Sequence, residues 1–170
     1  MDYFIDGFLA AAGVKPQITK AAQQEMDDEA CKLLSMYLAF TRALYLVHQE
    51  NHWQAQDYGQ HILFQRLYEE ASEVQDDAAE RVMGLCGQVS FEGAESAIAK
   101  RFAVKNPGLV DCLESSLAIE KAFQELCKDT YNTLDKKDML TLGLDDLIMS
   151  QASVGETHIY LLQQALKGLE

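Results

Sequence analysis

The stretch that decides the fold is residues 60–85, QHILFQRLYEEASEVQDDAAERVMGL. Apolar side chains recur in it at steps of three or four residues, which is the period of an amphipathic helix. This stripe consists of Leu67, Ala71, Val74, Ala78, Val82 and Leu85. Gly87 follows, and glycine is a common residue just beyond a helix C-terminus. We therefore expect one long helix with one buried face.

Three further segments show the same periodicity, at about residues 28–56, 107–134 and 137–169. The connection between the second and third helices, residues 88–106, is longer than the others and contains the amphipathic stretch AESAIAKRFAV. Long helices joined by short outer loops and one long middle connection are typical of a four-helix bundle with a single crossover. We predict an all-α, ferritin-like bundle with a short extra helix in that connection.

The chain divides into an N-terminal arm, residues 1–27, and the bundle, residues 28–170. The arm carries its own apolar residues, so we expect it to be partly helical. A chain of 170 residues, 48% of them hydrophobic, is long enough to bury one continuous core.

The composition excludes several classes of function. The chain has 27 acidic and 14 basic residues and a formal net charge of −13, which argues against a phosphate-binding surface. No continuous apolar run reaches the roughly 18 residues of a membrane-spanning helix, and the N-terminus lacks the basic start of a signal peptide. The four cysteines lie far apart and form no CxxC pair. We expect a cytoplasmic protein with reduced thiols.

Three of the four histidines, His48, His52 and His61, lie close together in the sequence. His48 and His52 are four residues apart and therefore share one helix face, at the end of its apolar stripe. Imidazole is a good ligand for iron and zinc. Two interpretations stay open at this point: hydrogen-bonded histidines that are partly buried, or metal ligands.

Acidic residues form a second stripe along the helix predicted at residues 60–85. Its members are Glu69, Glu73, Asp76 and Glu80. Asp76 and Glu80 each lie two residues from a core position, about 200° around the helix, so the stripe faces away from the core. It is either a solvated acidic face or the carboxylate half of a metal site.

The sequence disfavours a metal site inside the bundle. A di-iron centre there needs inward carboxylates and Glu-x-x-His pairs, and the chain has no such pair. The nearest pattern is Glu156-Thr157-His158, in which the two side chains point apart. Outward carboxylates of one chain would have to meet histidines of another.

The stretch NHWQAQDYGQHILFQRLYEEASEVQDDAAERVMGLCG, residues 51–87, resembles the signature of the Dps miniferritin family. In that family an HW pair ends the first helix, a second histidine opens the next, and D-x-x-A-E-R follows. Here these elements read His52-Trp53, His61 and Asp76-Asp77-Ala78-Ala79-Glu80-Arg81. The resemblance runs from about residue 30 to the C-terminus, and its most specific part is the combination of HW with AER.

The resemblance implies a hollow dodecamer of identical four-helix subunits. It also implies a ferroxidase site across a two-fold interface, with His52 and His61 from one chain and Asp76 and Glu80 from its partner. Trp53 would lie near this site. Iron would be oxidised there by peroxide or dioxygen and stored as Fe(III), with zinc as a possible competitor.

Two features depart from the family pattern. Gln65 stands where the family usually has another carboxylate ligand, and Glu69 or His48 is a candidate replacement. The segment between His52 and His61 is shorter than usual, so His61 matches either the ligand or a loop residue.

The family's DNA binding usually needs a basic terminal arm, whereas residues 1–30 contain only Lys15 and Lys20 against six acidic side chains. We therefore expect no direct DNA binding. Two alternatives to the ferroxidase remain: a Dps-like shell with a degraded metal site, favoured by Gln65, and a non-catalytic helical protein that binds a basic partner.

Overall fold

The computed structural model describes residues 26–105 and 107–169. Most of the predicted N-terminal arm, residues 1–27, lies outside these described residues. The described part of the chain contains helices and no strands. The all-α prediction is therefore confirmed.

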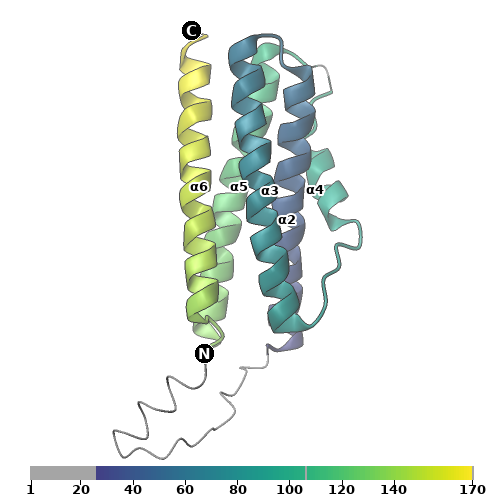
Figure 1. Cartoon of the computed structure of the whole chain (residues 1–170), viewed down its shortest axis with the longest axis vertical. Helices are drawn as coiled ribbons and strands as arrows, with labels where there is room; N and C mark the ends of the chain where they lie inside the picture. Colours follow the sequence, from purple (N-terminus) through teal and green to yellow (C-terminus); the bar gives the residue numbers. More distant parts are fainter. Residues whose placement is uncertain (1–25, 106, 170) are drawn as a thin grey trace, which may run out of the picture.

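Four long helices and one short helix make up the described structure (Figure 1). In chain order they are α2 (Asp28–Gln54), α3 (Tyr58–Cys86), α4 (Ala94–Phe102), α5 (Leu109–Lys136) and α6 (Leu142–Lys167). The four long helices run side by side, and α4 lies outside the bundle, where it packs against α2 and α5. The short helix in the long middle connection is thus confirmed.

Local capping interactions explain most of the helix ends. Asp27, Asp57 and Thr141 each accept a hydrogen bond from a backbone N–H in the first turn of α2, α3 and α6. Gly87 ends α3 with a φ of 71°, a conformation that glycine adopts without steric cost. The Thr141 cap starts α6 five residues later than its apolar periodicity alone predicts.

The core lies between the four long helices and is built from the predicted stripes. The largest fully buried side chains include Tyr37, Phe64 and Phe123, each of them at most 1% exposed. Phe123 packs on the rings of Tyr37 and Phe40, at centroid distances of 5.4 and 5.9 Å. This packing joins α2 to α5 across the interior.

Two of the four cysteines correct the expectation of reduced thiols. Cys31 and Cys86 form a disulfide with a Cα–Cα distance of 5.7 Å. It joins the first turn of α2 to the last residue of α3, 55 positions later in the sequence. Cys112 and Cys127 are free and buried, and burial raises the pKa of Cys127 to about 11.

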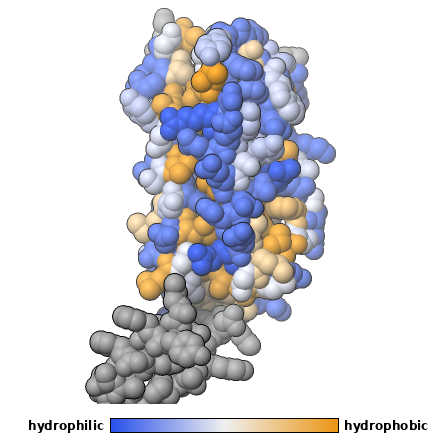
Figure 2. Space-filling model, in the orientation of Figure 1, coloured by the Kyte–Doolittle hydropathy of each residue, from blue (hydrophilic) through white to orange (hydrophobic). Residues whose placement is uncertain are grey.

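By length and composition, α2 could cross a membrane, but half of its most apolar window is buried within the bundle. A core helix of a four-helix bundle passes the same test, because it must bury a broad apolar face. The face of the molecule seen in Figure 2 is mostly hydrophilic, with apolar side chains in separate patches.

Candidate metal centre

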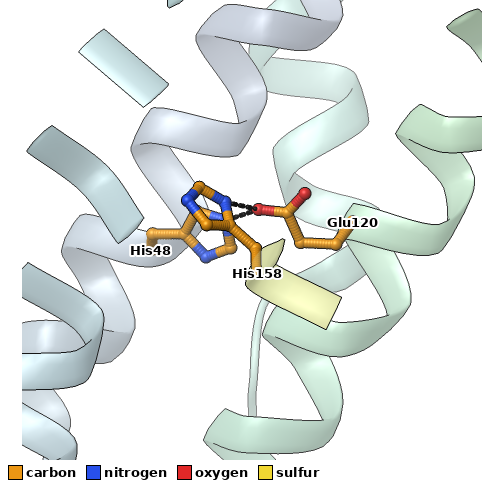
Figure 3. A group of neighbouring side chains, drawn as sticks. All are labelled: His48, Glu120 and His158. Carbon is orange, nitrogen blue, oxygen red and sulfur yellow. Dashed lines mark hydrogen bonds and ion pairs between the residues drawn. The ribbon is translucent and has the colours of Figure 1, made fainter. Parts of the chain in front are cut away.

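Two histidines and a glutamate meet in the middle of the bundle. His48 comes from α2, Glu120 from α5 and His158 from α6, and all three point toward one another (Figure 3). Nε2 of His48 lies 2.8 Å from Oε1 of Glu120, and Nδ1 of His158 lies 2.7 Å from the same oxygen. The three side chains are at most 2% exposed. A single carboxylate oxygen therefore accepts hydrogen bonds from two imidazoles in a site closed to bulk water.

A second set of polar groups holds the outer nitrogens of these histidines. Nδ1 of His48 lies 3.0 Å from Oγ of Ser116, and Nε2 of His158 lies 2.8 Å from Oε2 of Glu70. Arg66 in turn donates to Glu70 over 2.7 Å. Every ring nitrogen thus has a partner, as buried polar groups require. With Glu70 on α3, all four long helices contribute to one network.

The network determines the charges that it contains. Burial alone would raise the pKa of Glu120, but the hydrogen bonds from His158 and His48 outweigh it and lower that pKa. Burial alone would lower the pKa of His158, but its bonds to Glu120 and Glu70 raise that pKa instead. The interior therefore stabilises an ionised Glu120 beside a protonated His158.

The sequence disfavoured a metal site inside the bundle, yet this cluster brings together three groups that could hold an ion. The ligand atoms of His48, Glu120 and His158 all lie within 4.8 Å of one another. No Glu-x-x-His pair marks this cluster in the sequence, because α2, α5 and α6 each supply one of its side chains. A usable signal was present in the sequence: Glu120 lies three residues before the core residue Phe123, and His158 lies four before Leu162.

The second candidate group lies at the loop that joins α2 to α3. The rings of His52 and His61 stack with their centroids 3.9 Å apart. Nδ1 of His52 lies 2.9 Å from the backbone carbonyl oxygen of His61, so it donates to that oxygen. Trp53 beside them is 71% exposed, and the neighbouring Tyr58 is 80% exposed. The two histidines are therefore together, at an open surface that also carries aromatic side chains.

The predicted acidic stripe does face outward. Its four members, Glu69, Glu73, Asp76 and Glu80, are all exposed. At 1.5 Å per residue, Asp76 and Glu80 lie about 22 and 28 Å along α3 from His61. Within one chain the predicted site residues thus form two separate groups.

Comparisons with known proteins identify solved structures that have a similar fold. No protein-family model matches the chain, and no curated protein matches it. Among solved structures, a mutant of Dps1 from Mycobacterium smegmatis matches with a TM-score of 0.70 at 19% identity, over 83% of this chain and 99% of that one. Dps from Thermosynechococcus elongatus matches with a TM-score of 0.70 at 19% identity, over 82% and 90%. The chain has a Dps-like fold.

A third structure, Dps from Microbacterium arborescens in a high iron form, matches with a TM-score of 0.68 at 18% identity, over 84% and 98% of the two chains. This likeness confirms the ferritin-like bundle that the helix pattern predicted.

The structure also places Gln65, which departs from the Dps pattern, and its two candidate replacements, Glu69 and His48. Nε2 of Gln65 donates to Oε1 of Glu69 over 2.8 Å, so Glu69 is held beside Gln65 on the surface of α3. His48, the other candidate replacement, lies in the buried cluster rather than beside His52 and His61. Of these two candidate replacements, only Glu69 is exposed and lies on α3, the helix that carries His61.

Proposed function

We propose that this protein is a miniferritin that oxidises Fe(II) with peroxide or dioxygen and stores Fe(III) in a hollow homo-oligomeric shell, in the Dps arrangement a dodecamer. The ferroxidase ligands are His52 and His61 of one chain and Asp76 and Glu80 of its partner. Two Fe(II) ions give one electron each, and peroxide takes up both electrons with two protons to form water. Zinc competes for the same imidazole and carboxylate ligands.

One observation supports this proposal most strongly: the donors are divided within the chain. His52 and His61 lie together at one end of α3, and the exposed carboxylates Asp76 and Glu80 lie more than four helical turns away. A two-fold contact is reciprocal, so an interface that places the histidines of one copy against the carboxylates of the other forms two identical sites. The Dps-like fold is compatible with this assembly.

Gln65 favours one alternative, a Dps-like shell that binds iron or zinc weakly and oxidises little. An amide is a neutral ligand, and in this chain Gln65 already donates a hydrogen bond to Glu69. We further propose a cytoplasmic location without membrane contact and without direct DNA binding, in keeping with the net charge of −13. Because the cytoplasm is normally reducing, we expect the Cys31–Cys86 bond to form there only when conditions become oxidising.

The test is complementation between two inactive variants, His52→Ala and Glu80→Ala. Each alone should slow iron oxidation, because every site in its assembly lacks one ligand. When the two are coexpressed, a mixed pair contains one intact site, and random pairing restores about a quarter of the wild-type sites. The measurements are the absorbance of Fe(III) after adding Fe(II) and peroxide, and the particle size on a sizing column.

A matched control uses His52→Ala coexpressed with His61→Ala. Both ligands come from the same chain, so every mixed site still lacks one of them and no activity returns. Equal recovery in both mixtures, or none in either, would contradict a site shared between chains. A wild-type particle of dodecamer size that oxidises iron no faster than buffer would establish the degraded-site alternative.

A further inference from the structure

We propose that each chain holds a second metal site inside the bundle, where His48, Glu120 and His158 bind one divalent transition-metal ion that enters through an acidic groove between α3 and α6. Its three ligands are separate from those of the proposed surface ferroxidase, although Glu80 of that site also lines the groove. The interior site needs no second chain, because one subunit supplies all its ligands.

The ligand set is one that proteins use for such ions. Two imidazoles and one carboxylate, with a position left open, bind Zn²⁺ in several enzymes and Fe²⁺ in non-haem oxygenases. The ligand atoms here are Nε2 of His48, Nδ1 of His158 and a carboxylate oxygen of Glu120. Because each helix supplies one side chain, the site suits one ion rather than the pair of a di-iron bundle.

Only a small movement separates the hydrogen-bonded cluster from a coordinated ion. Both imidazole nitrogens lie 2.7–2.8 Å from the carboxylate oxygen. Around an ion with bonds of about 2.0–2.1 Å, neighbouring ligand atoms lie roughly 3.3 Å apart. Each imidazole nitrogen would therefore move about half an ångström away from the carboxylate oxygen, while the two nitrogens, which lie within 4.8 Å of each other, take up a similar spacing. As the ion replaces the shared protons, the proton on Nδ1 of His158 is released, and a neutral His48 keeps its proton by moving it from Nε2 to Nδ1, beside Ser116.

The outer partners are those expected around metal-bound histidines. Such histidines usually donate their other ring N–H to a carboxylate, carbonyl or similar acceptor, which fixes the orientation of the ring. Nε2 of His158 is held by Glu70, and Nδ1 of His48 is held by Ser116. Asn51 donates to Oγ of Ser116 over 2.8 Å, so this hydroxyl is itself held in place. Both rings are thus preoriented for an ion between them.

Space and charge at the cluster also suit an ion. A cavity of about 10 Å³, about the size of one water molecule, lies beside Glu120 and His158. Gly155 and several apolar side chains complete its lining, and His48 is not part of it. A side chain at Gly155 would press on Gln124 and come within 3.3 Å of Oε2 of Glu120, so glycine keeps this space open. Glu70 and Glu120 are both acidic, but Arg66 already pairs with Glu70, so Glu120 is the carboxylate whose charge is left to hold a divalent ion.

The route to the cavity is a groove of about 840 Å³ between α3 and α6. Its acidic lining residues are Glu70, Glu73, Asp77, Glu80 and Asp146. The groove and the cavity share Val74, Gln151 and Val154, so they adjoin each other. Arg81 is the one basic residue that lines this groove. A cleft with a predominantly acidic lining concentrates cations and speeds their entry. Glu70, which bonds His158, lies where the groove meets the cluster.

The test uses Co²⁺ as the probe, in a His52→Ala/His61→Ala background that lacks both histidines of the proposed surface site. We expect one tightly bound Co²⁺ per chain with strong visible ligand-field bands, typical of low coordination number. Adding Glu120→Gln should abolish these bands, whereas the matched exposed variant Glu69→Gln should keep them. Circular dichroism checks that each variant is helical. A background protein without tight Co²⁺ binding, or Glu120→Gln with unchanged bands, would overturn the proposal.

A second pair of substitutions tests the groove without touching the buried cluster. Glu73→Lys with Asp77→Lys changes exposed positions only, so folding should not be affected. The rate at which the Co²⁺ bands appear should fall about tenfold at low ionic strength and recover with added salt, with the final spectrum unchanged. An unchanged rate would show that the ion does not enter by this groove. Because both readouts are spectral and the surface site has lost both its histidines, they are independent of ferroxidase activity.

Discussion

This chain has two histidine groups, one around His48 and one around His52, and these two residues lie one helical turn apart on α2. The surroundings of the two groups are opposite. His48 is buried, and within one chain it meets Glu120 and, through it, His158. His52, four residues later, lies at an open surface with His61 as its neighbour, and the exposed carboxylates Asp76 and Glu80 are far along α3.

Burial decides whether a polar group can remain without a partner in its own chain. A buried imidazole or carboxylate needs hydrogen-bond partners in its own subunit, because bulk water does not reach it. An exposed group is hydrated by water, so it needs no protein partner until an ion or a second chain binds it. We therefore expect the buried group to determine stability and the exposed group to determine activity.

The largest effect on stability should follow from removing the central carboxylate. Glu120→Leu leaves one nitrogen of His48 and one of His158 buried without an acceptor, which should lower the free energy of unfolding by about 3–5 kcal/mol. The same change at the surface, Glu80→Leu, should alter it by less than about 0.5 kcal/mol. Urea unfolding of metal-free protein measures both.

A triple variant sharpens this prediction. His48→Leu, Glu120→Leu and His158→Leu together remove both the carboxylate and its partners, so much of the loss should be recovered. Ser116 keeps its bond from Asn51 in that variant. If the three losses simply add, the network is not the cause of the single variant's instability.

A smaller effect is expected at the end of the bundle farthest from His52 and His61, where the disulfide joins α2 to α3. Cys31→Ser with Cys86→Ser should lower the free energy of unfolding by about 2–4 kcal/mol in non-reducing buffer, because the loop that the bond closes is long. Reducing agent should lower wild-type stability to the same value and leave the variant unchanged. A reductant-sensitive variant would place the effect at Cys112 or Cys127 instead.

Much of the fold follows from local sequence signals. The stripe from Leu67 to Leu85 and the glycine at position 87 predicted nearly the full length of α3. The long middle connection predicted the crossover and its short helix. These features depend on residues a few positions apart, so periodicity and capping rules detect them. The outward direction of Asp76 and Glu80 follows from the same helix geometry.

The central cluster could not be found by such rules. Its members lie 72 and 38 positions apart in the sequence, and only the packing of α2 against α5 and of α5 against α6 brings them together. The Cys31–Cys86 bond spans 55 positions and escaped prediction for the same reason. An ionisable residue on an apolar stripe, as at Glu120, is the sequence signal that points to this kind of site.

The smallest expected effect is a change in the fluorescence of the chain's single tryptophan. Trp53 is next to His52 and 71% exposed in one chain, so a site shared between chains should cover it on assembly. Emission should then move to shorter wavelength, and acrylamide should quench it less in the assembled particle than in dissociated subunits. Ser116→Ala, a change in the central network, should leave both signals as in the wild type. Equal quenching in the particle and in free subunits would mean that Trp53 stays open to solvent, and His52 would then lack the partner carboxylates that the shared site requires.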